Sequence, residues 1–313
     1  MKKSAILIVN GFDRHNRWGT YTPQQASAHP WIDICLRQVQ RHSRGSSYDV
    51  LVYDNACLPQ HRRIMARFPQ VKVRPGLTGF LLSLALESLS LGRFGRRLLD
   101  LGHPGALDFL VDRLGDAYEY FITLDTDAFP VQDGWIEFLT ATVERGCALV
   151  GVYRDEMSPV LTPFVHVSCL CMRVHDFRQL PVSFSRAQMK DVGQNISVAL
   201  YRRAARVGCL DRTNRVNHHF LIAGVYGNLI YHHGAGSRHA RFWALKEAPR
   251  EAREQEERLK LDLQGRLFGD LDRFIEGLLS ARYGRLPSPT VRVLEAGAYP
   301  ALTQPGRSQR RMR

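Results

Sequence analysis

The sequence predicts an α/β protein built on a mostly parallel sheet that is flanked by helices. Short runs of apolar and β-branched residues alternate with amphipathic helical segments, as they do in successive βαβ units. The runs are nearly continuous in apolar residues, which is typical of strands buried on both faces. The chain has 313 residues and a hydrophobic content of 44%, enough for one large domain or two small ones.

The first half of the chain predicts a strand–helix alternation. Residues 4–9 form the first expected strand, which Asn10-Gly11 ends in a turn. The helix that begins at Trp31 has an apolar face, and the strand 49–53 that follows it ends at Asp54-Asn55. This βαβ unit should cross over in the right-handed sense. Further elements are expected as helix 59–67, strand 71–73, an irregular helical stretch 80–101, helix 106–115 and strand 120–124.

The second half is expected to continue the sheet and then to change character. Asp133 is the expected N-cap of the next helix. Strands are expected at 148–153, 164–172 and 228–231, with a helix between residues 191 and 208. Residues 245–283 are charged and helical in pattern, and the chain from Pro287 onward is expected to be a flexible basic tail.

The stretch YFITLDTDAFP carries the clearest chemical signal in the sequence. Its apolar run ends in Asp125-Thr126-Asp127, so the two carboxylates are expected at the carboxyl end of a buried strand. That edge is where ligands bind in open α/β sheets. Paired carboxylates suit a hard divalent cation, which in turn can hold a phosphate. The alternative is a strand that ends in an acidic turn without function, with Pro130 stopping the strand.

The charge balance indicates a partner that carries phosphates. Lys and Arg number 43 against 30 Asp and Glu, a net charge of +13, which favours a nucleotide, a nucleic acid or an anionic membrane surface. A generally basic composition explains the charge equally well. The six cysteines lack zinc spacing, and no nucleic-acid-binding motif is present, so a specific nucleic acid is not expected.

The apolar segments also bear on location. The N-terminal run is too short for a signal peptide, and the Leu-rich run 80–91 is far shorter than the ~20 residues that span a bilayer. We therefore expect a cytoplasmic protein. The tail RSQRRMR is a candidate for peripheral contact with the inner face of the membrane.

Four segments together resemble family 2 glycosyltransferases. They are WIDICLRQVQRH with the following YDVLVYDNA, then ALDFLVDRLGDAYEYFITLDTDAFPVQDGWIEFL with its DxD motif, MKDVGQNISVALYRRAARVG, and YHHGAGSR. The resemblance covers about residues 4–238, and its weight lies in the order and spacing of the segments. It implies a GT-A-like, Rossmann-like catalytic domain over 1–238, with a nucleotide-binding half (1–130) and an acceptor half (131–238). A helical extension (239–286) and the tail (287–313) follow.

The resemblance implies a metal-dependent, inverting transfer of a sugar. The donor would be a nucleotide-diphosphate sugar, UDP- or dTDP-linked, and the acceptor a hydroxyl on a sugar, a lipid-linked or a small molecule. The cofactor would be Mn²⁺ or Mg²⁺. Asp127 would bind the ion directly, and Asp125 would reach the ribose or the ion through water. Either His232 or His233 could add a nitrogen ligand, and His233 is the one we assign.

The remaining site residues follow from the same resemblance. Donor contacts are expected from Asn10, Gly11, Asp13, Asp54, His103, Asp125 and Arg238. Asp191 matches the family's catalytic carboxylate, and Asp155 and Glu156 are reserve candidates for the base. Lys190 stands where the family has Glu, and a neighbouring Lys would lower the pKa of Asp191.

Structural roles compete with several of these assignments. Asp54 is also typical of an ordinary turn at the end of a strand, and His103 could cap the N-terminus of a helix. Asp191 could be an acidic residue that the helix dipole stabilises. A haloacid-dehalogenase-like phosphatase would use Asp125 as its nucleophile. Phe129-Pro130 and the two βα units before the motif argue against that class. A non-catalytic basic protein that binds nucleotides or nucleic acid is the other alternative.

Overall fold

The computed structural model describes residues 3–11, 30–55, 59–75, 102–156, 158, 161–185, 191–234, 250–280 and 285–300. Its main sheet comprises β1 (Lys3–Asn10), β2 (Tyr48–Asp54), β3 (Val71–Pro75), β4 (Tyr118–Asp125), β6 (Leu149–Arg154), β7 (Phe164–Arg173), β8 (Val207–Leu210) and β11 (Arg292–Leu294). Their order across the sheet is β11-β8-β6-β7-β4-β1-β2-β3. Only β7 and β11 run against the other strands of this sheet, so the predicted mostly parallel α/β architecture is confirmed.

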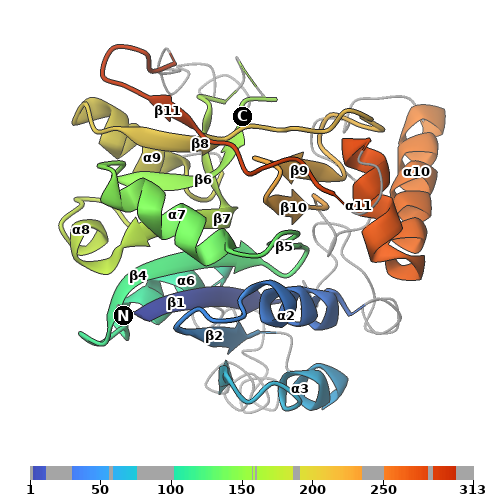
Figure 1. Cartoon of the computed structure of the whole chain (residues 1–313), viewed down its shortest axis with the longest axis horizontal. Helices are drawn as coiled ribbons and strands as arrows, with labels where there is room; N and C mark the ends of the chain where they lie inside the picture. Colours follow the sequence, from blue (N-terminus) through green and yellow to red (C-terminus); the bar gives the residue numbers. More distant parts are fainter. Residues whose placement is uncertain are drawn as a thin grey trace, which may run out of the picture.

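Helices cover both faces of the sheet (Figure 1). Along β1, Ile6 and Ile8 point to one face, while Ala5, Leu7 and Val9 point to the other, as the pleat requires. The first face packs against α2 (Trp31–His42), α3 (Pro59–Met65) and α7 (Trp135–Glu144). The second packs against α6 (Gly102–Asp112), α8 (Val174–Arg178) and α9 (Gln194–Arg202). Burial on both faces explains the apolar runs of the central strands.

A small second sheet lies beyond the carboxyl ends of the parallel strands. It consists of β5 (Ala128–Pro130), β9 (Gly224–Tyr226) and β10 (Ile230–His232), paired antiparallel in the order β5-β10-β9. Because β5 follows β4 after only two residues, this sheet is tied to the end of β4. The predicted helical extension is α10 (Arg250–Gly269) and α11 (Leu271–Leu279), which pack beside it (Figure 1).

Several expectations about elements need correction. The strands β5, β8 and β9 and the short helix α8 were not foreseen, and β8 begins within residues 191–208, where a helix was expected. Asp133 does not cap α7, because Gly134 occupies the N-cap with a φ of 72° and the Asp133 carboxylate lies 2.7 Å from His42 Nδ1 instead. The chain after Pro287 is part of the fold over residues 285–300, because β11 pairs with β8. The expected elements within 80–100, and the tail segment 301–313, lie outside the described residues.

None of the helices in the described part of the chain combines the length and the apolar character that a membrane crossing requires.

Candidate active site

The acidic turn, by which we mean residues 125–127, joins β4 to β5 at the carboxyl edge of the main sheet. The amide of His233 donates to the carbonyl of Asp127 at 2.9 Å, so the turn is held by the chain just after β10. The register of β10 places His232 opposite Ala128 on β5. Pairing between strands about a hundred residues apart therefore carries His232 to the two acids.

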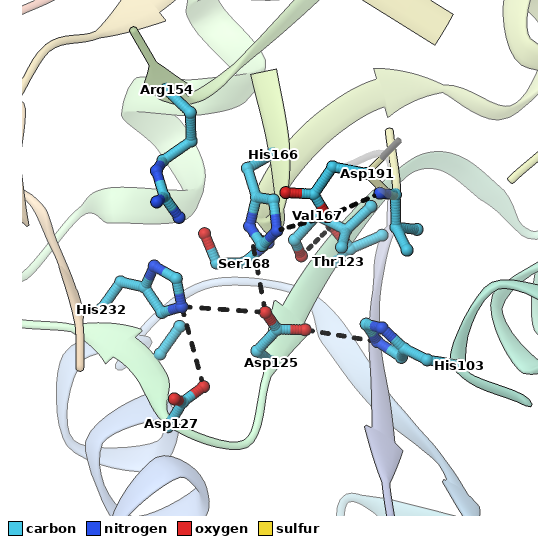
Figure 2. A network of polar contacts seen from close by, with 12 residues as sticks. His103, Thr123, Asp125, Asp127, Arg154, His166, Val167, Ser168, Asp191 and His232 are labelled. Atoms are coloured by element: carbon cyan, nitrogen blue, oxygen red, sulfur yellow. Dashed lines mark hydrogen bonds and ion pairs between the residues drawn. The ribbon is translucent and has the colours of Figure 1, made fainter. Parts of the chain in front are cut away.

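Two histidine rings approach this turn with nitrogen atoms that could bind a metal (Figure 2). His232 Nε2 lies 3.9 Å from Asp125 Oδ2 and 3.8 Å from Asp127 Oδ1. On the other side, Asp125 Oδ2 lies 4.0 Å from His166 Nδ1. Donor atoms of Asp125, His166 and His232 all fall within 4.8 Å of one another. Ligands that bind one ion at about 2.1 Å lie roughly 3–4 Å apart, so His232 Nε2, at 3.9 and 3.8 Å from one oxygen each of Asp125 and Asp127, is placed to share a divalent cation with them.

His232 has the protonation state that a metal ligand needs. Burial lowers its pKa well below the usual value, and the nearby His166 and Arg154 add to the effect against the opposing charges of Asp125 and Asp191. The ring is therefore neutral, and Nε2 can offer a lone pair toward the acids.

His233, which the sequence analysis assigned to the metal, is placed elsewhere. Its ring is fully buried, with Nδ1 2.7 Å from the Tyr231 hydroxyl and its face 4.7 Å from the Trp31 ring. Adjacent residues of a strand point to opposite sides, so only one of the two histidines can reach the turn. That residue is His232, and it replaces His233 in the ligand set.

His166 links the acidic turn to Asp191. The Ser168 amide donates to His166 Nδ1 at 3.0 Å, which leaves Nε2 facing Asp191, 3.8 Å from its Oδ1. The ring also stacks on His232 with 5.5 Å between centroids. A metal bound through Nδ1 would have to displace the Ser168 amide. His166 is therefore better suited to bridging Asp125 and Asp191 than to binding an ion.

His166 reaches the site because β7 bulges there. Gly151 pairs with Leu170 and Tyr153 pairs with Val165, so β7 advances five residues (165 to 170) while β6 advances two (151 to 153). Such bulges re-aim side chains and are common beside active sites. Gly151 is required here, because a Cβ at this position would lie 2.0 Å from the carbonyl oxygen of Cys169.

His103 joins the site from a third direction (Figure 2). It lies in the first turn of α6, and its Nε2 is 3.2 Å from Asp125 Oδ1. One oxygen of Asp125 therefore faces His103, and the other faces His166 and His232. The sequence predicts His103 near the nucleotide or in a helix cap, and the structure places it beside the acidic turn.

Asp191 lies at the start of the α9 region and faces His166. Its Oδ1 accepts a hydrogen bond from the Val192 amide at 2.8 Å. Burial alone would raise its pKa, but His166, the Val192 amide and Arg154 outweigh burial and lower the pKa to about 2. The Asp191 pKa is therefore lowered by His166, the Val192 amide and Arg154. Lys190, to which this lowering was assigned from the sequence, lies outside the described residues.

The other residues predicted to contact the nucleotide-sugar donor lie on the β1–β2 side of the sheet. Asn10 Nδ2 donates to Asp54 Oδ1 at 2.8 Å, and Arg62 Nε lies 3.8 Å from the other oxygen of this fully buried carboxylate. Gly11 follows β1 directly. The Asp54 carboxylate therefore contacts other residues of the protein on both of its oxygens. Asp13 and Arg238 lie outside the described residues.

Four polar residues of the site region were not predicted there or were predicted in another role. Arg154, His166 and Ser168 were not singled out from the sequence, and Glu156 was a reserve candidate for the base. Glu156 in fact receives hydrogen bonds from Arg154 Nε at 2.9 Å and from the Tyr226 hydroxyl at 2.7 Å. Asp155, the other reserve, is exposed. The polar His166 and Ser168 within the otherwise apolar FVHVSCLCM were the available signal.

No protein-family model and no curated protein matches this chain. Among solved structures it is similar to the mannosyltransferase PcManGT from Pyrobaculum calidifontis in complex with GDP-Man and Mn²⁺. Identity is 13%, coverage is 65% of this chain and 52% of the other, and the TM-score is 0.41, so the chain spans about half the length of that enzyme.

Two further structures are similar at the same level. Staphylococcus aureus TarS 1–349 in complex with UDP-GlcNAc has 12% identity, 89% and 82% coverage of this and that chain, and a TM-score of 0.43. The 4-diphosphocytidyl-2C-methyl-D-erythritol synthase of Anaerococcus prevotii has 10% identity, 67% and 88% coverage, and a TM-score of 0.42. These are distant likenesses, and the proposals below rest on the side chains of this protein.

Proposed function

We propose that this protein is a divalent-cation-dependent glycosyltransferase that moves a sugar from a nucleotide-diphosphate donor to a hydroxyl acceptor. The observation that carries the proposal is the acidic turn at the carboxyl end of β4, where His232 lies within 4 Å of both Asp125 and Asp127. A carboxylate pair with an added imidazole at this edge of a parallel sheet suits a cation that binds a diphosphate.

Three side chains bind the cation in this proposal, and a fourth orients one of them. Asp125, Asp127 and His232 hold Mn²⁺ or Mg²⁺, and a nitrogen ligand favours Mn²⁺. When bound, the cation offsets the negative charge that develops on the departing diphosphate. His103, 3.2 Å from the second oxygen of Asp125, fixes the orientation of that carboxylate. The donor nucleotide, UDP or dTDP, lies over β1 and β2, near Asn10 and Asp54.

Asp191 is the proposed base for the acceptor hydroxyl in an inverting transfer. Its pKa of about 2 keeps it ionised at neutral pH, so it is ready to accept a proton. The same low pKa makes it a weak base. A weak base is sufficient if the proton leaves late, because the hydroxyl becomes strongly acidic once its oxygen bonds to the anomeric carbon. His166, 3.8 Å away, holds the carboxylate in place.

Release of nucleoside diphosphate from a panel of UDP-, dTDP- and GDP-sugars tests this function. We expect turnover of at least one donor with Mn²⁺ and its loss in EDTA. Asp127→Ala should abolish turnover, and Asp191→Asn should lower kcat by about 10²-fold or more with little change in nucleotide affinity. Absence of turnover for every donor, with several acceptor classes and Mn²⁺ present, would contradict the proposal.

A further inference from the structure

A second polar group lies beside the acidic turn, on β6 and β7. Arg154 is the last residue of β6, and its side chain is 13% exposed. Its Nε donates to Glu156, and the other oxygen of Glu156 accepts from the Tyr226 hydroxyl. This chain of bonds, from β9 through Glu156 to Arg154, fixes the guanidinium group in one orientation.

Hydrogen-bond donors of this group are left unused. In the described part of the chain, Arg154 makes no hydrogen bond other than that of Nε, so its two terminal nitrogens have no protein acceptor. The Ser168 hydroxyl is completely buried and has no protein partner. Figure 2 shows the Arg154 guanidinium directed toward Ser168 and the His232 ring. Leaving the buried Ser168 hydroxyl unpaired costs about 1–3 kcal/mol, so a bound group that pairs with it is favoured.

The arrangement of donors selects the chemistry of that group. Two parallel N–H donors on a planar guanidinium match two oxygens of one carboxylate or phosphate. A hydroxyl beside them can donate to the same group. From these contacts we propose that Arg154 and Ser168 form a subsite for an oxyanion, either a carboxylate or a phosphate.

The sheet order places β6, the strand that carries Arg154, away from the strands over which the nucleotide is proposed to lie. β6 lies two strands from β4, on the side opposite β1, β2 and β3. Neighbouring strands are about 4.8 Å apart, so the two strand ends are separated by roughly 10 Å. An oxyanion here belongs to the transferred sugar or to the acceptor. This last step rests on the proposed function, whereas the binding of an oxyanion does not.

The test is calorimetric titration of the full-length chain with inorganic phosphate and with D-glucuronate, in EDTA so that no metal–phosphate complex forms. Saturable binding of at least one anion is expected, weakened about tenfold or more in Arg154→Lys, which keeps the charge but loses the fork. Ser168→Ala should weaken binding about threefold to tenfold. Arg173→Lys is the control, because Arg173 lies at the opposite end of β7 beside Glu119, and binding should be unchanged.

Two results would overturn the subsite: no saturable binding of either anion to the wild type, or equal affinity in Arg154→Lys. If circular dichroism shows that Arg154→Lys does not fold, Tyr226→Phe provides the second variant. It removes the hydrogen bond from Tyr226 to Glu156 and should weaken anion binding severalfold. Unchanged affinity in both Tyr226→Phe and Ser168→Ala would then overturn the proposal.

The source of the oxyanion is tested separately with Mn²⁺ present. Tighter binding of UDP-glucuronate than of UDP-glucose, lost in Arg154→Lys, would place the carboxylate on the donor sugar. Binding of glucuronate or phosphate that adds to UDP binding without competing would place the anion on the acceptor. Competition between free UDP and phosphate for the Arg154-dependent site would overturn the location away from the nucleotide. Arg154-dependent anion binding without any nucleotide binding would leave the subsite standing and refute the glycosyltransferase.

Discussion

His232 and His233 are neighbours in the sequence, but their surroundings in the fold differ. His232 faces the carboxylates of Asp125 and Asp127, whereas His233 is enclosed by Trp31 and Tyr231. Both rings are buried, and burial lowers both pKa values well below the usual value. Burial and charge state therefore do not distinguish a ligand from a core residue here, and the direction of the side chain does.

Substitution of each histidine by Gln should separate the two roles. His232→Gln removes a nitrogen ligand, so we expect Mn²⁺ affinity to fall about tenfold or more while the free energy of unfolding changes by about 1 kcal/mol or less. His233→Gln should leave Mn²⁺ affinity nearly unchanged and destabilise the fold by about 2–3 kcal/mol, because the ring contact with Trp31 and the hydrogen bond to Tyr231 are lost. Calorimetric Mn²⁺ titration and urea unfolding measure both quantities. The opposite pattern would return the ligand role to His233.

At the scale of single residues, sequence reasoning reached part of the candidate site. Asp125 and Asp127 could be proposed because an apolar strand ends in acid, a signal contained within a few residues. The choice between His232 and His233 depended on the register of β10 against β5, which is a long-range pairing. Arg154 and Ser168 depended on the irregular pairing of β6 with β7. No local pattern specifies such a register.

At the scale of elements, the bulge of β7 is the feature that shapes the site. It presents His166 and Ser168 near the end of β4, and it is possible because Gly151 on β6 lets the Cys169 carbonyl approach. Gly151→Ala should destabilise the protein by about 2–4 kcal/mol and weaken oxyanion binding at Ser168. Gly115→Ala is the control, since a Cβ there meets nothing within 4 Å. Urea unfolding compares the two, and equal stabilities would show that the close approach does not matter.

A second element-scale feature is the carboxylate of Asp49, which joins four strands at the amino edge of the sheet. Lys3, Lys72 and the Tyr118 hydroxyl, from β1, β3 and β4, all contact it. Burial raises the Asp49 pKa, but these three partners outweigh burial and lower the pKa from 3.8 to about 2. Because the folded-state pKa is depressed, the stabilisation is complete above about pH 4 and is lost as the pH falls toward 2.

Asp49→Asn should therefore cost about 1–2 kcal/mol of unfolding free energy at neutral pH, a value reduced for the exposure of Lys72. The difference from the wild type should shrink between pH 4 and pH 2, where the wild-type carboxylate becomes protonated. Urea unfolding of both proteins at several pH values measures it. A difference that stays constant across that range would show that the ionised carboxylate is not the source of the stabilisation.

At the scale of the whole molecule, most of the strands and helices from β1 to β7 were predictable, whereas the short elements β5 and α8 and the strand β8 were not. Apolar runs and amphipathic helices repeat there with clear boundaries, and the sheet follows from them. The C-terminal strand was not predictable, because its stability comes from partners far away in the sequence. β11 pairs with β8, the Asn228 side chain donates to the Ser288 carbonyl at 2.9 Å, and the Thr290 amide donates to Gly227 at 2.9 Å.

Deletion of residues 287–313 should accordingly destabilise the protein. The deletion exposes the edge of β8 and removes the buried Leu294, so we expect a loss of about 3–5 kcal/mol and a tendency to aggregate. Leu294→Ala, which keeps the strand, should cost about 2–3 kcal/mol. Thermal unfolding with light scattering measures both effects. A deletion variant as stable and as monodisperse as the full chain would contradict the place of β11 in the core sheet.

The central claim is that the acidic turn binds a nucleoside diphosphate through a divalent cation. Thermal shift of the full-length protein with UDP, dTDP and GDP, with Mn²⁺ or with EDTA, tests it most directly. We expect at least one nucleotide to raise the Tm only when Mn²⁺ is present. The shift should vanish in Asp125→Ala and Asp127→Ala and should persist in Asp133→Ala, whose carboxylate pairs with His42 away from the turn. A nucleotide-dependent shift that is unchanged in EDTA or in the Asp127 variant, or no shift with any nucleotide, would contradict the claim.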